Sequence, residues 1–305
     1  MIAPKTTVLD KGNLVITSDS PQFLEYCSLQ HFTTKNIMQA QSLDQNSLVF
    51  SFSDCAAKKT FDLARLTDKK RCVFFPIHVF ENTINNALYS LECFLKSDIT
   101  QALKEQQKAL ELINCKSPLA LTGPSTQSTV NVLSSAVPYA MLDGDLKDNF
   151  VHSAAEFFEV HLAHMQPQTA CPFTVNGEFR VSGILTVLRK AQSAPPDITN
   201  SLTTLIGEVA SKQASLKVEG NKVRSFTVDN RDYADLIKRA AGKRGAHLTE
   251  FAIGVNQAIT PIIDFSINSQ MNEGVSGVHV AIGDGTNGYH IDFLCPDVVV
   301  LKAVT

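Results

Sequence analysis

The chain has 305 residues, of which 44% are hydrophobic and 19% charged, and its formal net charge is −3. No basic excess points to nucleic acid as a partner, and no apolar run approaches the ~18 residues of a membrane span. The first twenty residues lack the charged and apolar regions of a signal peptide, so we expect a cytoplasmic protein. The seven cysteines stand singly, without a Cys-x-x-Cys pair, which is typical of reduced thiols.

The first half of the chain alternates predicted strands with predicted helices. Apolar residues at helical spacing predict helices over residues 86–113, with a break at Ser97 and Asp98, and over residues 148–165. Short apolar runs bounded by turn residues predict strands at residues 13–18, 47–53, 72–77 and 118–123. Strands separated by helices indicate an α/β domain over residues 1–165.

The second half is typical of antiparallel strands. The proline-bearing segment 166–172 predicts a boundary, and residues 170–305 then form a mixed α+β domain rich in antiparallel strands. Residues 214–230 alternate apolar and polar around a Gly-Asn turn and predict a hairpin, while residues 231–245 predict an amphipathic helix that ends at a glycine. Further apolar runs predict strands at residues 248–256, 276–283, 289–295 and 297–304.

Two histidines and an aspartate, His279, His290 and Asp292, stand in a run that otherwise predicts a hairpin. A two-residue turn at Asp284-Gly285 sets the two histidines opposite each other, and Asp292 then shares their face of the sheet. Two imidazoles and one carboxylate on one face suit a divalent metal with open coordination positions.

The same hairpin has a second candidate turn, Asn287-Gly288, which is also a strong hairpin signal. This turn sets His279 opposite Pro296 and separates the three side chains. Both registers stay open. In addition, a lone histidine in an apolar strand is more often a hydrogen-bonded core residue than a metal ligand.

Five segments of the second half follow one another in a recognisable order: PFTVNGEFRVSG, SLKVEGNKVRSFTVDN, YADLIKRAAGKRGAHLTEFAIGVN, GVHVAIGDG and YHIDF. Together they resemble the catalytic domain of the thermophilic metallo-aminopeptidase family, the leucyl aminopeptidase and aminopeptidase T group, which also includes 2,5-dihydroxypyridine dioxygenases. The resemblance covers residues 170–305. It implies one or two divalent ions of Zn, Mn, Co or Fe, or none if the site is degenerate, and a homodimer. The metal ligands it implies are Glu178, Glu250, His279, His290 and Asp292.

The sequence departs from the family between His279 and His290. The peptidases have a longer segment there, with a tyrosine thought to stabilise the reacting carbonyl, whereas the single tyrosine here is Tyr289, which in a regular strand points away from the face of His290. A secondary candidate for metal binding is the pair His161 and His164, three residues apart on the predicted helix.

Three functions agree with these patterns. We rank first a metal-dependent hydrolase, in which a metal-bound hydroxide attacks a peptide or amide carbonyl. The shortened segment supports a second, a catalytically idle peptide-binding protein that presents a peptide to a modifying enzyme in peptide natural-product biosynthesis. The third is an Fe(II) ring-cleaving dioxygenase. Both enzyme hypotheses need the Asp284-Gly285 register or an equivalent bulge, whereas the peptide-binding protein does not. The partner in each case is a peptide or a small molecule.

Overall fold

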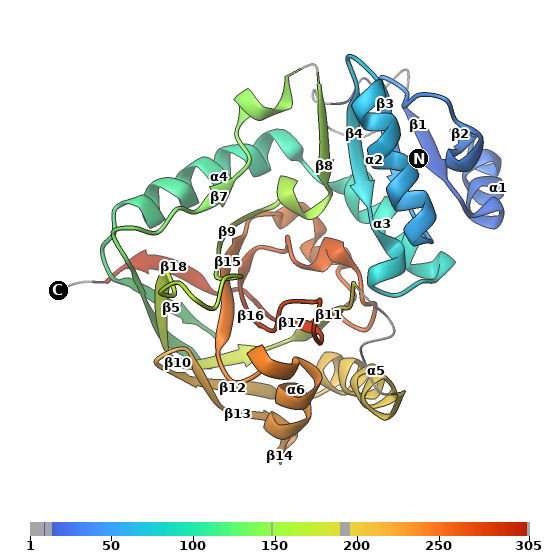
Figure 1. The fold of residues 1–305 in the computed structure, drawn as a ribbon. Coiled ribbons are helices and arrows are strands. Elements are labelled where there is room, and N and C mark those ends of the chain that lie inside the picture. The colour runs from blue at the N-terminus through green and yellow to red at the C-terminus, as the bar shows by residue number, and fades with distance from the viewer. Residues whose placement is uncertain (1–8, 10–13, 148, 190–195, 304–305) are drawn as a thin grey trace.

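The computed structural model describes residue 9 and residues 14–147, 149–189 and 196–303 (Figure 1). Within these ranges no helix is long and apolar enough to cross a membrane. All seven cysteines lie in the described ranges, and none forms a disulfide. The segment predicted to lack a signal peptide lies largely outside the described residues, as do residues 13, 148 and 304 of three predicted elements. The predicted fold class is confirmed, since a parallel sheet with helices precedes sheets rich in antiparallel strands.

The first part of the chain forms a five-stranded parallel sheet in the order β2-β1-β3-β4-β8. Its strands are β1 Val15–Ser18, β2 Thr33–Asn36, β3 Asn46–Phe50, β4 Arg71–Phe75 and β8 Phe150–Ser153. The helices that follow them are α1 Pro21–Leu29, α2 Asp54–Leu66, α3 Ile84–Lys96 and α4 Ile99–Asn114. Helix α2 packs on one face, in a cluster with Val49 and Phe74, while α1 and α3 pack on the other with Phe50 and Phe75. Burial of both faces explains why the central strands β1, β3 and β4 are rich in apolar residues, whereas the edge strand β2 is polar and partly exposed.

Two further sheets pack face to face in the rest of the chain (Figure 1). The seven-stranded sheet consists, in spatial order, of β14 Arg231–Asp232, β13 Lys222–Val228, β12 Ala214–Glu219, β10 Phe173–Val181, β6 Thr126–Val132, β5 Leu119–Gly123 and β18 Val299–Lys302. The six-stranded sheet consists of β11 Gly183–Val187, β17 His290–Pro296, β16 Gly277–Ile282, β15 Leu248–Gly254, β9 Glu159–Ala163 and β7 Tyr139–Ala140. Helices α5 Pro196–Ser211 and α6 Ala234–Ala240 complete this part. Phe226 meets Phe293 between the two sheets, with ring centroids 5.0 Å apart.

The larger of the two hydrophobic clusters runs through the molecule from the parallel sheet to the antiparallel sheets. The ring centroid of Phe50 lies 4.2 Å from that of Phe75, Phe75 lies 5.5 Å from Phe94, and Phe94 lies 6.2 Å from Phe157, so aromatic contacts lead from the parallel sheet to the edge of the six-stranded sheet. The predicted domain boundary between residues 165 and 170 stays a prediction. The strands β5, β6, β7 and β9 precede that position. β5 pairs with β6 and β7 pairs with β9, and β5, β6 and β9 also pair with strands that follow it.

Several predicted elements are confirmed with small shifts of their ends. The helical stretch 86–113 forms α3 and α4, and the break falls where predicted, because Ser97 ends α3 and the side chain of Asp98 caps α4 by accepting from the Gln101 N–H. The hairpin predicted at 214–230 forms β12 and β13. Gly220 and Asn221 turn the chain with φ angles of 55° and 64°, the positive values that a two-residue hairpin turn needs.

The helix predicted over residues 148–165 is wrong, and the helix predicted over 231–245 is too long, since α6 ends at Ala240. The first segment forms β8, a short 3-10 helix and β9. In β9, Val160 and Leu162 point into the core while Glu159 and His161 share the opposite face. Its backbone is paired on both sides, by β15 and by β7, and these long-range partners outweigh the local helical spacing.

Candidate metal centre

One face of the six-stranded sheet gathers acidic and imidazole side chains from four neighbouring strands. Phe293 of β17 points to the seven-stranded sheet, so the alternate residues of β17 point to the opposite face. The side chains on this opposite face are Glu159 and His161 of β9, Glu250 of β15, His279 of β16, and His290 and Asp292 of β17.

Neither predicted turn forms the β16–β17 hairpin. His279 pairs with Leu294 and Ala281 pairs with Asp292, a register between the two alternatives, and residues 283–289 form a longer connection. Pairing in any of these registers keeps His279, His290 and Asp292 on one face, because all three registers differ by an even number of residues. The side chains therefore meet diagonally, although the two histidines are not directly opposite.

Small residues make room for the long side chains. Ala163 pairs with Glu250, Ala252 pairs with His161, and Ala281 pairs with Asp292, so these three polar residues each have an alanine beside them on the same face. At Gly254 the chain before β16 crosses the face so closely that a Cβ atom would lie 2.0 Å from the carbonyl oxygen of Val275. The backbone thus closes over one end of the cluster.

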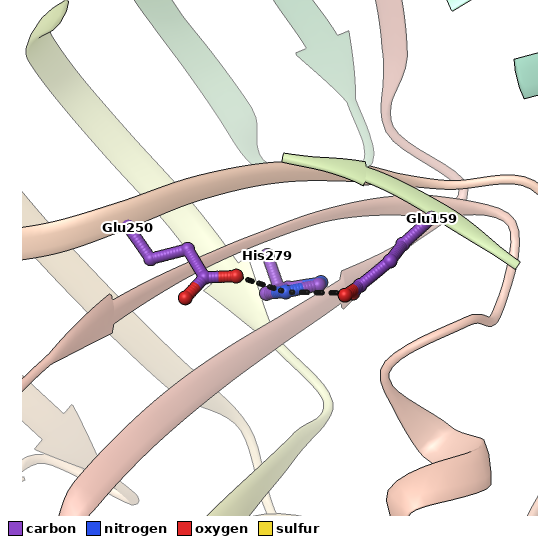
Figure 2. Close-up of side chains that lie close together, drawn as sticks. All are labelled: Glu159, Glu250 and His279. Carbon is purple, nitrogen blue, oxygen red and sulfur yellow. Dashed lines mark ion pairs between the residues drawn. The ribbon is translucent and has the colours of Figure 1, made fainter. Parts of the chain in front are cut away.

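His279 lies between two carboxylates (Figure 2). Its Nε2 is 3.5 Å from Glu159 Oε2 and 3.7 Å from Glu250 Oε1. The three side chains are buried, with 3%, 7% and 11% of their surfaces exposed for His279, Glu159 and Glu250. Ligand atoms at about 2.0–2.2 Å from a shared ion lie about 3–4 Å from each other. These three residues could therefore hold a metal ion with little movement.

A second group adjoins the first through Glu250. The Nε2 of His290 is 3.1 Å from Asp292 Oδ1 and 3.5 Å from Glu250 Oε2. Glu250 thus directs one carboxylate oxygen to His279 and the other to His290, and Asp292 Oδ1 is 4.0 Å from His279 Nε2. This arrangement offers two neighbouring cation positions that share a carboxylate.

Two carboxylate oxygens in the cluster, Glu159 Oε2 and Asp292 Oδ2, are buried and accept no hydrogen bond from any described residue. A buried carboxylate oxygen without a donor is costly, and a cation is one way to satisfy it. The donor set of carboxylates and imidazoles fits Zn, Mn, Co or Fe(II). The residues present therefore fit a divalent metal.

The charges of the cluster perturb its own titration. Burial opposes the charged form of His290, but the Asp292 and Glu250 carboxylates outweigh burial and raise the pKa of His290 to about 10. Burial likewise opposes ionisation of Glu250, yet the surrounding imidazoles lower its pKa to about 2. Burial raises the pKa of the nearby Glu273 well above its usual range, and repulsion from Glu159, Asp292 and Glu250 adds to the effect. Without a metal, protons bound to these side chains therefore offset the excess negative charge of the carboxylates.

His161 connects the cluster to the surface. Its Nδ1 is 3.1 Å from Glu159 Oε1, and its ring stacks on Tyr139 with centroids 5.2 Å apart. Burial alone would lower the pKa of His161, but the Glu159 and Glu250 charges outweigh it and raise the pKa to about 9. The Tyr139 hydroxyl donates to Glu156 Oε2 at 2.6 Å. His164 follows the last residue of β9. Because successive side chains of a strand alternate between its two faces, His164 points to the face opposite that of His161.

Four of the five ligands implied by the family resemblance lie together in the cluster, namely Glu250, His279, His290 and Asp292. Glu178 lies elsewhere, because it belongs to β10 of the other sheet, where its exposed carboxylate accepts from Ser215 Oγ at 2.6 Å.

Glu159, which is not among the implied ligands, lies in the cluster beside His279. The misassigned helix concealed it, although the alternation of Glu159 and His161 with Val160 and Leu162 is a strand signal. Tyr289 is buried and its hydroxyl lies 2.9 Å from Thr199 Oγ1 of α5, so it contacts that helix.

Two solved structures resemble the fold. Wild-type AmpT from Thermus thermophilus matches with a TM-score of 0.47 and 14% identity, over 94% of this chain and 89% of that chain. The 2,5-dihydroxypyridine dioxygenase from Pseudomonas putida KT2440 matches with a TM-score of 0.49 and 10% identity, over 95% of this chain and 87% of that chain. No curated protein matches the sequence. Residues 11–302 match the family described as crocagin biosynthetic protein CgnE/B, and because this match spans nearly the whole chain, the protein belongs to that family.

Proposed function

We propose that this protein binds a peptide and presents it to a modifying enzyme in a biosynthetic pathway, without cleaving it. The observation that carries the proposal is membership, over residues 11–302, of a family of crocagin biosynthetic proteins. This membership is consistent with peptide biosynthesis, and a protein with that role must recognise its substrate but need not hydrolyse it.

The burial of the cluster supports binding over hydrolysis. A catalytic metal keeps a coordination position that the substrate can reach. Here the side chains of His279, Glu159 and Asp292 have only 3%, 7% and 1% of their surfaces exposed. A small cation fits among these atoms, whereas a peptide carbonyl needs the covering backbone to move. A metal held by Glu159, Glu250 and His279 would neutralise buried carboxylates and tie β9, β15 and β16 together.

A metal-dependent hydrolase is the second candidate, and the shared Glu250 carboxylate favours it. Two adjoining cation positions bridged by one carboxylate are the arrangement used by two-metal hydrolases, in which the ions lower the pKa of a bound water. Glu159, Glu250 and His279 would hold one ion, and His290, Asp292 and Glu250 the other. The dioxygenase hypothesis and the homodimer stay predictions.

A peptide-binding experiment separates the two candidates. The probe is a random-peptide library displayed on phage, and selected peptides are synthesised with a fluorescein label. We expect fluorescence anisotropy to show the same affinity with and without EDTA, and mass spectrometry to recover the peptide intact. Cleavage products formed by metal-loaded protein, but not by Glu250→Gln, would establish the hydrolase instead. Failure to select any peptide above background would remove the binding proposal.

A further inference from the structure

The last strand of the seven-stranded sheet, β18, has one free edge. Among the described residues it pairs only with β5, with Val299 opposite Thr122 and Leu301 opposite Ala120, and the Ala303 N–H donates to the Pro118 carbonyl at 2.8 Å. Hydrogen-bonded pairs alternate along an antiparallel ladder. The N–H and C=O groups of Val299 and Leu301 therefore point to β5.

The N–H and C=O groups of Val300 and Lys302 consequently point away from β5. No described residue forms a hydrogen bond with these four groups. Sheet edges are usually protected by proline, a bulge or several charges. Of these devices β18 has only the single charge of Lys302, and its Val299 and Leu301 side chains are 55% and 52% exposed.

A hollow of about 300 Å³ adjoins this strand. Its lining includes Val299 and Val300 of β18 and, from α4, the apolar Ala109 and Leu112 beside the charged Glu105 and Lys108. Ile253 and Gly254 of β15 and Gly277 of β16 also line the hollow, whereas none of the described residues of β5 does, so the hollow lies where β18 meets α4 and the ends of β15 and β16. The open backbone edge thus lies beside a hollow to which both β18 and α4 contribute apolar side chains.

We propose that the free edge of β18 is the peptide-binding surface, and that it takes an extended peptide as an eighth strand of the sheet. This inference rests on the proposed function and names its surface. A row of unpaired N–H and C=O groups is complementary to another extended backbone. Alternate apolar side chains of the peptide fill the hollow against Ala109 and Leu112 or cover Val299 and Leu301.

Charge completes the description of the occupant. Lys302 is exposed, and no described carboxylate pairs with it. An acidic side chain across the new ladder from Lys302 matches this charge. A second copy of the chain is a poorer match, because antiparallel self-pairing of so short a strand brings the Lys302 side chains of both copies into one ladder, where like charges repel.

The test substitutes a backbone donor on the free edge. Val300→Pro removes an N–H that faces away from β5 and leaves the β5 ladder intact. The control, Val300→Thr, keeps the N–H and nearly the same side-chain shape. With the library-selected fluorescent peptide, we expect Val300→Pro to weaken binding about tenfold, the effect of losing one to two backbone hydrogen bonds, and Val300→Thr to bind like the wild type. Lys302→Glu should weaken binding of peptides with an acidic residue and restore it for peptides with lysine there.

A second probe does not depend on the folding of the proline variant. A peptide N-methylated at alternate amides cannot donate to the edge, so it should lose affinity for the wild-type protein. Equal affinity of wild type and Val300→Pro would overturn the edge assignment and leave the proposed function standing, whereas no binding by the wild type would remove the proposed function itself. If sedimentation shows a wild-type dimer that Val300→Pro separates, the edge belongs to a second copy, and the peptide assignment is wrong.

Discussion

Glu250 is the residue that joins the two halves of the buried cluster. Its Oε1 lies 3.7 Å from His279 Nε2 and its Oε2 lies 3.5 Å from His290 Nε2. Replacing this carboxylate by an amide leaves two buried imidazoles with less negative charge, and it removes a donor from both cation positions. Variants at Glu250 therefore change stability and metal binding together, and a cleaner test of metal binding uses Glu159, which contacts His279 from one side.

We expect Glu159→Gln to lower the affinity for Zn or Mn by at least about tenfold, since even residues behind the ligands of a metal site contribute that much. The matched control is Glu178→Gln, because Glu178 lies in the other sheet and contacts Ser215. Elemental analysis of the purified variants by inductively coupled plasma mass spectrometry measures the metal. A loss of metal in the Glu178 variant and not in the Glu159 variant would restore the ligand set that the family resemblance implies.

The titration of His290 predicts how the metal-free protein responds to pH. Its pKa is raised from an ordinary value of 6.5 to about 10 in the folded protein. The stability it contributes is therefore fully present below pH 6.5 and is lost as the pH rises through 10. We expect urea unfolding in EDTA to show stability falling across this range, and falling less steeply in His290→Gln. Equal slopes for the two proteins would contradict the pairing of His290 with Asp292.

At the scale of elements, the connection between β16 and β17 fixes how the cluster assembles. Gly283 begins it with φ at 83°, and a Cβ atom there would lie 1.9 Å from the Tyr289 carbonyl oxygen. The Gly283 carbonyl also lies 3.2 Å from His290 Nδ1, so the same turn orients that imidazole. The side chain of Asp284 accepts from the backbone of Thr286 and Asn287 and holds the rest of the loop.

Gly283→Ala should therefore destabilise the protein by about 1–3 kcal/mol, the cost of strain at a positive φ angle together with the close contact. The control is Gly207→Ala in α5, where a Cβ atom meets nothing within 4 Å and alanine favours the helix by up to about 1 kcal/mol. Chemical unfolding of both variants measures the difference. A Gly283 variant as stable as wild type would show that the connection adopts another conformation.

Elements whose sequence signal is local were predictable. Ser97 and Asp98 separate α3 from α4, and Gly220-Asn221 turns β12 into β13, because capping and turn chemistry act within a few residues. The strand β9 was not, because its partners β15 and β7 come from distant parts of the chain.

The same distinction between local and long-range signals applies to the residues of the site. The pattern of alternate residues places His290 and Asp292 on one face whatever the turn, while Glu159 joins them only through the pairing of β9 with β15. The exact register of β16 with β17 also escaped prediction, since it depends on the longer connection that Gly283 begins.

At the scale of the whole molecule, strands from both halves of the chain are interleaved in both antiparallel sheets. In the seven-stranded sheet β10 lies between β6 and β12, and in the six-stranded sheet β15 lies between β9 and β16. Removing β6 and β9 would leave the central strands β10 and β15 with unpaired backbone groups along one edge. It would also remove Glu159 and His161 from the cluster.

We therefore expect residues 170–305, produced alone, to lack a cooperative thermal transition, although the sequence suggests a separate domain there. The matched fragment 118–305 keeps every strand of the two antiparallel sheets and should recover the near-ultraviolet circular dichroism of packed aromatic pairs such as Phe226 and Phe293. If only the longer fragment folds cooperatively, the missing strands are the reason that the shorter fragment does not fold. Because β6 pairs with β10 over six consecutive residues and β9 pairs with β15 over five, these strands complete ladders that the C-terminal half cannot close by itself. A sharp transition in the fragment 170–305 would instead mean that β10 and β15 hold their places without them, and that the division of the chain near residue 170 is a true domain boundary.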